Sequence, residues 1–336
     1  MHVLLTGAFG NIGMSALEAL LARGHAVRCF DVPTAANRAQ AARFGEKIEV
    51  VWGDLRRAED VNAAVKGQDV VVHLAFIIPK LSATGVESEA EPNLAWDVNV
   101  GGTHHVIEAC RAQPRRPKLI FSSSYHVFGV TQHLSPPRTV ADPVNPVEHY
   151  SKHKVACEWM VQASDLQWSI LRFSATLPIT LTLDPYLFHI PLDNRMEFTH
   201  TRDVGTAVAN AVTSEAIWGK LLLIGGGPKC QLLYGEIVAK VMEGLGIGML
   251  PAAAFGTEYF PTDWVDATES QRLLQYQQRT FDDYVADVIA LLGPKRYLLR
   301  LARPFVRAWL LRKSPFWKER RAGRVARPAV PHPVTP

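Results

Sequence analysis

The chain has 336 residues, of which 48% are hydrophobic and 20% are charged, and its formal net charge is +4 at pH 7. This composition excludes a chain that is disordered throughout, and the length suits one domain with a smaller lobe or two domains. No apolar run approaches the ~20 residues that span a bilayer, and the 4 cysteines are too far apart for a metal-binding pattern or a disulfide framework. We therefore expect a reduced, cytoplasmic protein without a targeting segment.

Short apolar runs predict parallel strands, because helical patterns separate each run from the next. Continuous apolar strands of this kind are covered by helices on both faces of a sheet. The sequence therefore predicts an α/β protein with a Rossmann-like, doubly wound parallel sheet of about seven strands and a smaller C-terminal substrate lobe. The predicted strands cover residues 3–6, 26–30, 48–52, 69–74, 119–121, 169–173 and 221–224, and the clearest helices cover 99–110 and 150–162.

Ligands of such a sheet bind at the carboxyl ends of its strands. Five residues with polar or small side chains stand at or just after predicted strand ends, and we expect them to line one crevice. They are Gly7, Asp31, Asp54, His73 and Ser124.

A glycine-rich turn follows the first strand and opens a helix. Gly7 permits the tight turn, Gly10 lets the backbone approach a pyrophosphate, and Gly13 lets the helix pack closely on the strand. Asp31 follows Gly13 by 18 residues, close to the ~20 expected for an acid that holds the ribose hydroxyls. A carboxylate there repels a 2′-phosphate, so NAD is favoured over NADP, although Arg38 nearby would soften that preference.

Further motifs follow in a fixed order. After Thr6-Gly7-Ala8-Phe9-Gly10-Asn11-Ile12-Gly13 come Gly53-Asp54-Leu55, His73-Leu74-Ala75, Asn99-Val100-Gly101-Gly102-Thr103, Ser122-Ser123-Ser124-Tyr125-His126-Val127-Phe128-Gly129, Tyr150-Ser151-Lys152-His153-Lys154 and Phe198-Thr199-His200-Thr201-Arg202-Asp203-Val204. Over residues 1–245 this order resembles the extended short-chain dehydrogenase/reductase family, the NAD-dependent epimerases and dehydratases. The resemblance implies a set of cofactor-binding residues: Gly7, Phe9, Gly10, Asn11, Ile12, Gly13, Asp31, Asp54, Leu55, Leu74, Ala75, Asn99, Ser122, Tyr150 and Lys154.

The resemblance also implies that Ser124, Tyr150 and Lys154 are catalytic. Tyr150 and Lys154 are four residues apart, so they share one helix face. A lysine ammonium and the positive nicotinamide would both lower the pKa of the phenol. Tyr150 would then exchange a proton with a substrate hydroxyl while a hydride moves to or from NAD. Ser124 would hydrogen-bond the same oxygen, and Lys154 would hold the nicotinamide ribose.

Other polar residues near these motifs have two interpretations each. Asn99 is expected either to cap a helix or to order the local polar network. His149 and His153 flank Tyr150 and are expected at the surface, although His153 could face the site. Asp203 is expected to cap a helix. The sequence contains no metal-binding cluster.

The substrate region departs from the family pattern. Nucleotide-sugar enzymes of the family often carry an asparagine where this chain has Ala175, and their Gly-Pro is replaced by Leu177-Pro178. The loop that follows is apolar. These differences favour a less polar substrate, such as a lipid-like or isoprenoid-like alcohol or ketone.

The predicted division gives residues 1–175, joined by 198–226, to the NAD-binding domain, and 176–197 and 227–294 to the substrate lobe. Residues 295–327 contain 12 Lys/Arg and 1 acid, while the rest of the chain contains 24 basic and 31 acidic residues. We expect 295–323 to form a basic amphipathic helical tail, either packed on protein or lying on an anionic membrane surface, and 324–336 to be disordered.

Three functions fit these observations. The leading hypothesis is an NAD-dependent oxidoreductase or epimerase-type enzyme that moves a hydride between NAD and a carbinol or carbonyl carbon of a small, hydrophobic substrate. The alternatives are a nucleotide-sugar epimerase or dehydratase, and a non-catalytic NAD-binding docking protein. By family analogy, the helices at 99–111 and 150–163 would pair in a homodimer. No nucleic-acid partner is expected.

Overall fold

The computed structural model describes residues 1–79, 85–180 and 185–321. Its centre is a parallel sheet of seven strands, which confirms the predicted fold class. The strand order β3-β2-β1-β4-β5-β6-β8 places the reversal of strand order between β1 and β4, where doubly wound sheets bind ligands. The strands are β1 (His2–Thr6), β2 (Ala26–Asp31), β3 (Glu49–Trp52), β4 (Val70–His73), β5 (Lys118–Ser124), β6 (Trp168–Phe173) and β8 (Lys220–Ile224).

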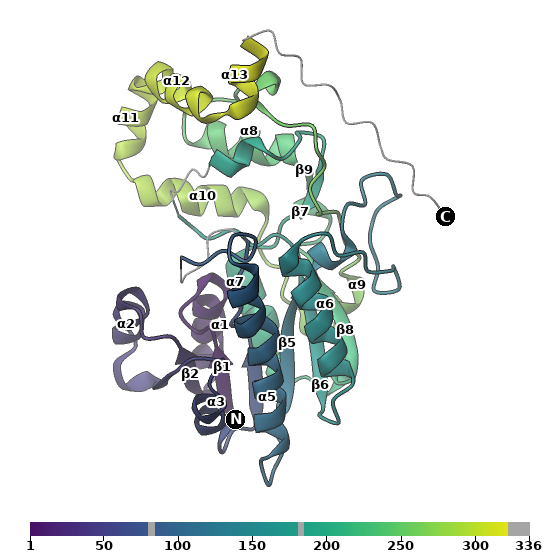
Figure 1. Cartoon of the computed structure of the whole chain (residues 1–336). Helices are drawn as coiled ribbons and strands as arrows, with labels where there is room; N and C mark the ends of the chain where they lie inside the picture. The colour runs from purple at the N-terminus through teal and green to yellow at the C-terminus, as the bar shows by residue number, and fades with distance from the viewer. Residues whose placement is uncertain (80–84, 181–184, 322–336) are drawn as a thin grey trace.

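Helices cover both faces of the sheet (Figure 1). Leu5 and Val72 belong to the core under α1 and α7, whereas Leu4 and Val71 belong to the core under α3, α5 and α6. Neighbouring residues of one strand therefore enter different cores, as the alternation of side chains along a strand requires. The covering helices are α1 (Asn11–Ala22) and α7 (Thr201–Thr213) on one face, and α3 (Ala58–Val65), α5 (Gly102–Arg111) and α6 (His149–Gln162) on the other, while α2 (Ala35–Ala42) links β2 to β3.

The helix around Asn99 is longer than predicted. It begins at Pro92, seven residues before the expected start, and runs through α4 (Pro92–Trp96) and a π turn (Asp97–Gly101) into α5. Proline at the first helical position fits a helix start, since its missing N–H has no partner there. The π turn offsets the following turns and carries Asn99 on the inner side of the helix.

The start of α7 also differs from the expectation. His200 is the N-cap, and its Nδ1 accepts a hydrogen bond from the amide of Arg202 at 3.2 Å. Asp203 does not cap the helix. Its Oδ2 instead accepts from the amides of Gln278 and Arg279 at 2.9 and 2.8 Å, so the carboxylate holds a distant loop against the sheet domain.

A second lobe lies beyond the carboxyl ends of the strands (Figure 1). It has its own aromatic core, in which Phe188, Phe198, Phe255 and Phe281 are buried. Its small antiparallel sheet was not predicted from the sequence. The lobe contains β7 (Arg195–Glu197) paired with β9 (Gln231–Leu233), α8 (Tyr234–Gly244) and α10 (Phe281–Leu292), whereas α9 (Thr268–Leu274) packs beside β8.

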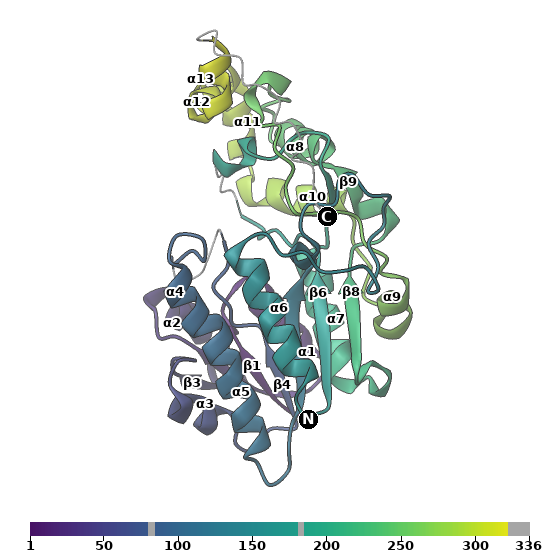
Figure 2. The same ribbon diagram turned by 45° about the vertical axis from the view of Figure 1, so that its right-hand side comes forward.

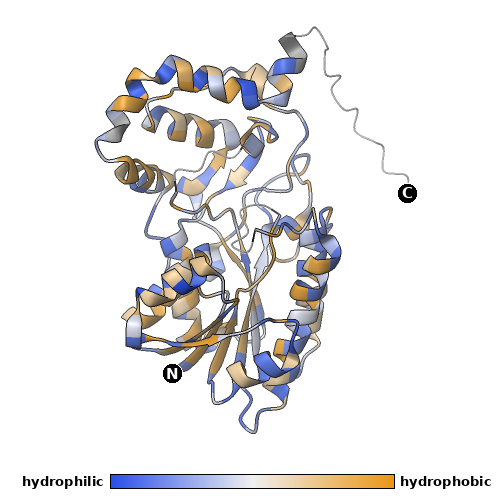
Figure 3. Cartoon of the chain, turned by 60° about the vertical axis from the view of Figure 1, so that its left-hand side comes forward, coloured by the Kyte–Doolittle hydropathy of each residue, from blue (hydrophilic) through white to orange (hydrophobic). Residues whose placement is uncertain are grey.

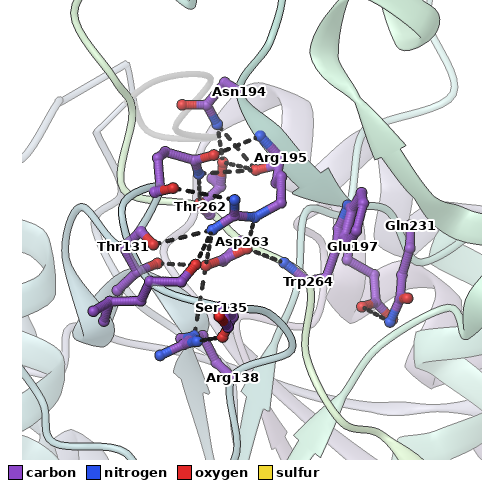
Figure 4. Close-up of polar contacts among 12 residues, drawn as sticks. Thr131, Ser135, Arg138, Asn194, Arg195, Glu197, Gln231, Thr262, Asp263 and Trp264 are labelled. Atoms are coloured by element: carbon purple, nitrogen blue, oxygen red, sulfur yellow. Dashed lines mark hydrogen bonds and ion pairs between the residues drawn. The ribbon is translucent and has the colours of Figure 1, made fainter.

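A polar network joins the second lobe to the loop after β5 (Figure 4). Asp263 is 2% exposed and accepts hydrogen bonds from Arg195 Nε at 2.6 Å and from Thr131 Oγ1 at 2.7 Å. Close by, the buried carboxylate of Glu197 accepts from Gln231 Nε2 at 3.0 Å and from two backbone amides. Burial raises the pKa of Glu197 to about 7, and these donors limit the rise. The network fixes β7 relative to the sheet.

Three helices follow residue 294 and pack on the second lobe: α11 (Lys295–Leu301), α12 (Arg303–Lys313) and α13 (Pro315–Arg321). Figure 3 shows apolar and polar residues mixed along these helices, in contrast to the apolar strands. Among the described helices, none combines the length and the apolar character of a membrane span. The end that was expected to be disordered, 324–336, lies outside the described residues.

Candidate active site

The glycine turn after β1 is tight, and one side of its backbone stays open. Gly7 has φ of +66°, and a Cβ there would lie 2.7 Å from the backbone nitrogen of Ala75. A Cβ at Gly13 would lie 2.0 Å from the carbonyl oxygen of Gly7. At Gly10 the nearest atom to such a Cβ is 3.5 Å away, and no side chain in the described part of the chain caps α1. The first amides of α1 are therefore available to a phosphate group.

Asp31, at the end of β2, lies beside this turn. Its Oδ2 accepts a hydrogen bond from the amide of Phe9 at 3.0 Å, and its Oδ1 accepts from Asn37 Nδ2 at 3.0 Å. Burial raises the pKa of Asp31, and backbone donors offset part of the rise. The carboxylate therefore ties the glycine turn to β2 as well as facing the adjacent cavity.

A cavity of about 310 Å³ follows the carboxyl ends of β1 to β4, and its walls bring together Gly7, Gly10 and Asp31 with four predicted cofactor residues of later motifs. Asp54 in this wall pairs with Arg56 at 2.5 Å, and the guanidinium lowers the pKa of its carboxyl group. The four later residues are Asp54, Leu55, Leu74 and Ala75.

The other predicted cofactor residues do not line this cavity. Phe9 and Asn11 border a separate hollow that also involves Arg202 of α7. Ser122 is buried beneath the site, where its Oγ donates to the carbonyl oxygen of His73 at 3.0 Å.

His73 does not line the crevice, contrary to the expectation. Its side chain is 1% exposed and lies between Thr6, at 2.8 Å from Nδ1, and Thr103, at 3.1 Å from Nε2. Because the Thr6 hydroxyl already accepts from the amides of Leu74 and Ala75, it donates to His73. Burial lowers the pKa of His73 to about 3. This neutral imidazole joins β1, β4 and α5, because the end of β4 is still inside the sheet.

Asn99 orders a loop and does not cap a helix. Its Oδ1 accepts from the amide of Ile77 at 2.7 Å, and its Nδ2 donates to the carbonyl oxygen of the same residue at 3.0 Å. Nδ2 also lies 3.3 Å from Nδ1 of His153. His153 is 2% exposed and packs against Trp96, so the expectation of a surface histidine was wrong. The helix that begins at Pro92 covers it, and that extension was not predicted.

Ser124, Tyr150 and Lys154 converge where β5 meets α6. The Ser124 hydroxyl accepts a hydrogen bond from the amide of His126 at 3.2 Å and lies close enough to the Tyr150 phenol to lower its pKa. Lys154 is 2% exposed; its Nζ donates to the carbonyl oxygen of Ser122 at 2.6 Å and lies 5.8 Å from the centre of the Tyr150 ring. Phe76, a wall residue of the cavity, covers both groups: its ring centre is 3.4 Å from Nζ and 5.8 Å from the Tyr150 ring centre. The cavity lining includes Phe76 but none of these three side chains, so the Phe76 ring separates Tyr150 and Lys154 from the cavity.

The charges at this point differ from the expected ammonium–phenolate pair. Burial raises the pKa of Tyr150 above its ordinary value, and the Ser124 hydrogen bond opposes part of the rise. Burial lowers the pKa of Lys154 to about 7. The expected lowering of the phenol pKa by Lys154 is therefore not found, since Nζ is directed to the Ser122 carbonyl and not to the phenol oxygen. Ser124 is the group that favours the phenolate here.

A buried ion pair supports this arrangement and was not predicted. Glu158 of α6 pairs with Arg172 of β6 at 2.7 Å, and Ser123 Oγ donates to the same carboxylate at 2.5 Å. The pair fixes α6 against β5 and β6. Glu158 lies four residues after Lys154, so helix periodicity could have placed it on the inner face.

A ring-lined region faces Tyr150 from the second lobe. His126 packs against Tyr150 and Phe260, with ring centres at 5.9 and 5.2 Å, and Phe260 packs against Tyr186 at 6.0 Å. His126 Nδ1 lies 2.8 Å from Oε2 of Glu148, the N-cap of α6. The sequence placed Tyr186 and Phe260 in the second lobe, but only the fold reveals that Phe260 contacts His126 and Tyr186 contacts Phe260.

The chain is similar to known proteins over about half of its length. Residues 3–180 match the model of the NAD dependent epimerase/dehydratase family. A 3-beta-hydroxysteroid dehydrogenase of Mycolicibacterium neoaurum is 29% identical over 174 residues, which cover 52% of this chain and 46% of that protein. Sterol demethylase protein B of Methylococcus capsulatus is 32% identical over 165 residues, with coverage of 47% and 45%. The chain thus spans about half the length of these curated relatives.

Solved structures agree in fold. A dTDP-glucose 4,6-dehydratase of Streptomyces venezuelae, solved with NAD, aligns with a TM-score of 0.72 at 22% identity and covers 89% of this chain and 98% of its own. A UDP-glucose 4-epimerase of Stenotrophomonas maltophila aligns with a TM-score of 0.70 at 21% identity, with coverage of 90% and 100%. At these identities the likeness establishes the architecture. Since the family model spans more than half of the chain, the protein belongs to the NAD dependent epimerase/dehydratase family, within the extended short-chain dehydrogenase/reductases.

Proposed function

We propose that this protein is an NAD-dependent oxidoreductase or epimerase-type enzyme that acts at a carbinol or carbonyl carbon, with Tyr150 as the acid and base. The observation that carries the proposal is the convergence of Ser124, Tyr150 and Lys154 directly behind Phe76, a wall residue of the cavity that begins at the glycine turn. A docking protein without catalysis would need none of these three groups in that place.

The cavity fits a dinucleotide. The amides of Asn11 and Ile12 would hold the pyrophosphate, because the surface over Gly10 is open. The Asp31 carboxylate would accept from the ribose hydroxyls and would repel a 2′-phosphate, which favours NAD over NADP. Lys154 would hold the nicotinamide ribose. Held by these residues, the nicotinamide would supply the site at which a hydride from the substrate carbon is accepted or from which it is returned.

Tyr150 and Ser124 would handle the substrate oxygen. In the oxidative direction Tyr150 takes the hydroxyl proton, and in the reductive direction it gives the proton back. Ser124 donates a hydrogen bond that stabilises negative charge, first on the phenol oxygen and then on the substrate oxygen. His126, held by Glu148, offers a further polar contact to the substrate beside Tyr150.

We propose an apolar alcohol or ketone as the substrate. Phe260 and Tyr186 supply ring faces next to His126, and Ala175 offers no hydrogen-bond donor for a diphosphate. The steroid and sterol named for the curated relatives are substrates of this chemical class. A nucleotide-sugar epimerase or dehydratase is the second candidate, since enzymes of that kind share the overall fold.

Initial rates separate the two candidates. The purified protein would be given NAD with a panel of hydrophobic secondary alcohols and, separately, of nucleotide sugars. Reduction of NAD with the alcohols alone supports the proposal. Turnover confined to nucleotide sugars would reject the apolar substrate while leaving the Tyr150 chemistry intact.

The assembly is a further part of the proposal. We propose a homodimer through α5 and α6, which lie side by side (Figure 2), because Trp159 on α6 is 65% exposed. Trp159→Glu should convert the dimer to a monomer in size-exclusion chromatography with light scattering. A native protein that elutes as a monomer would contradict this.

We also propose which parts of the chain bind the cofactor, the substrate and the membrane. Residues 1–175 with 198–226 would bind the cofactor, and 176–197 with 227–294 would bind the substrate. The basic segment 295–321 would hold a cytoplasmic enzyme at the anionic inner face of the membrane.

A further inference from the structure

The helices α11 to α13, called the arm here (residues 295–321), are fixed to the second lobe by their inner side. Arg307 Nη1 donates to the carbonyl oxygens of Ile247, Gly248 and Met249 at 3.0, 2.6 and 2.8 Å. Ser314 Oγ donates to the carbonyl oxygen of Ala254 at 2.6 Å. Leu310 is 2% exposed within the core of the lobe. Arg307 is therefore a structural anchor of the arm.

The outer side of the arm is apolar and open. Leu298, Leu301 and Phe305 are 65%, 80% and 78% exposed, and Trp309 is 49% exposed. Leu298 and Leu301 share one face of α11, and Phe305 and Trp309, four residues apart, share one face of α12. Of the 14 large hydrophobic side chains exposed in the described residues, 6 lie between 291 and 309. A side so rich in exposed apolar groups indicates a contact surface.

The charge of the arm selects the partner. The arm contains 10 Lys/Arg and 1 acid, and Arg300, Arg303, Arg312 and Lys313 are exposed; Nζ of Lys313 lies 5.7 Å from the centre of the Trp309 ring. A second copy of the arm would bring like charges together across a two-fold axis. Nucleic acid would leave the leucines and Phe305 without a partner. An anionic lipid surface satisfies both features, since acyl chains accept the apolar groups and headgroups attract the cations.

A series of aromatic rings connects the arm to the candidate active site. Each ring contacts the next, so the arm and the region beside Tyr150 belong to one continuous apolar structure. The pairs are Phe316–His189 at 5.4 Å, His189–Tyr186 at 5.2 Å, Tyr186–Phe260 at 6.0 Å, Phe260–His126 at 5.2 Å and His126–Tyr150 at 5.9 Å between ring centres.

We propose that the outer side of the arm, made by Leu298, Leu301, Phe305 and Trp309, lies flat on an anionic lipid surface. The second lobe and its ring series then stand at the lipid, and the sheet domain points away from it (Figure 1). The inference rests on the proposed peripheral location and names the surface that produces it. It does not depend on the chemistry proposed for Tyr150.

Vesicle flotation with full-length variants tests the surface. Leu301→Ser/Phe305→Ser removes two side chains that make little contact with the lobe, and Leu134→Ser/Val140→Ser removes two exposed apolar side chains outside the arm. On vesicles containing phosphatidylglycerol, we expect the arm variant to lose at least about tenfold in partition coefficient and the control to match the native protein. Binding should weaken on phosphatidylcholine alone and with added salt.

Two results overturn the inference. If the arm variant floats as well as the native protein, another surface meets the lipid. If the native protein does not float at all, the peripheral location itself is wrong. Because flotation is measured without substrate, either result stands apart from the outcome of the turnover assays. Circular dichroism of each variant checks that the fold is intact.

Discussion

Lys154→Met should gain stability relative to the native protein as the pH falls. Burial lowers the pKa of Lys154 from 10.5 to about 7. Between these values the unfolded chain binds a proton that the folded chain does not, so the native protein loses stability at ~1.4 kcal/mol per pH unit as the pH falls. The loss is complete near pH 7 and absent above the ordinary pKa of lysine. Met has a similar length and carries no charge, so the variant escapes this effect.

The magnitude follows from the structure. Between about pH 9.5 and about pH 7 this proton uptake lowers the free energy of unfolding of the native protein by ~3 kcal/mol. The Phe76 ring, 3.4 Å from Nζ, and the Ser122 carbonyl both favour the charged form. They hold the pKa somewhat higher and reduce the expected change to ~2 kcal/mol.

Urea denaturation of both proteins across this pH range measures the difference. Lys152→Met is the matched control, because Lys152 is exposed on the same helix. The difference in the free energy of unfolding between Lys152→Met and the native protein should not change with pH. If the stability that Lys154→Met gains over the native protein stays constant with pH, or grows as the pH rises, burial does not lower the pKa of this lysine.

Three further predictions concern the cofactor, the substrate and the lobe junction. Gly13→Ala should abolish NAD binding in calorimetric titration, because its Cβ would lie 2.0 Å from the Gly7 carbonyl oxygen and displace the turn; unchanged affinity would contradict this. Phe260→Ala should raise KM for an apolar alcohol about tenfold and leave the Kd of NAD unchanged, since the ring contacts His126 and not the cavity; an unchanged KM would remove Phe260 from the substrate region. Arg195→Met should cost ~3 kcal/mol or more in thermal unfolding, because it leaves Asp263 buried with a weaker counter-charge; a loss below ~1 kcal/mol would show that the network contributes little.

The sheet and the glycine turn could be predicted because their signals are local. Each apolar strand is continuous in sequence, and Gly7, Gly10 and Gly13 are required by backbone geometry within one strand–helix unit. The order of the remaining strands follows from parallel pairing with right-handed crossovers.

Features that depend on distant contacts were not predicted. β7 and β9 are three residues each and form only because Arg195 and Leu233 meet across the second lobe. The burial of His153 depends on a helix that begins at Pro92 and covers it. The position of Lys154 depends on Phe76, whose ring lies between the lysine and the cavity.

The orientation of the arm also depends on distant contacts and was not predicted. Its basic and amphipathic character could be predicted from the sequence, but the spacing of Arg300, Arg303 and Arg307 could not indicate which side faces the protein. Arg307 lies inward because backbone carbonyls at residues 247–249 accept its hydrogen bonds. Leu301 and Phe305 are consequently directed outward.

The catalytic role of Tyr150 is the central claim, and Tyr150→Phe tests it most directly. With NAD and a substrate identified from the panel, kcat should fall at least ~100-fold, while the Kd of NAD measured by calorimetry should stay within about twofold, because the phenol oxygen is removed and the ring retained. Tyr259→Phe, at an exposed tyrosine outside the site, should behave as the native protein. Unchanged turnover in Tyr150→Phe would contradict the account.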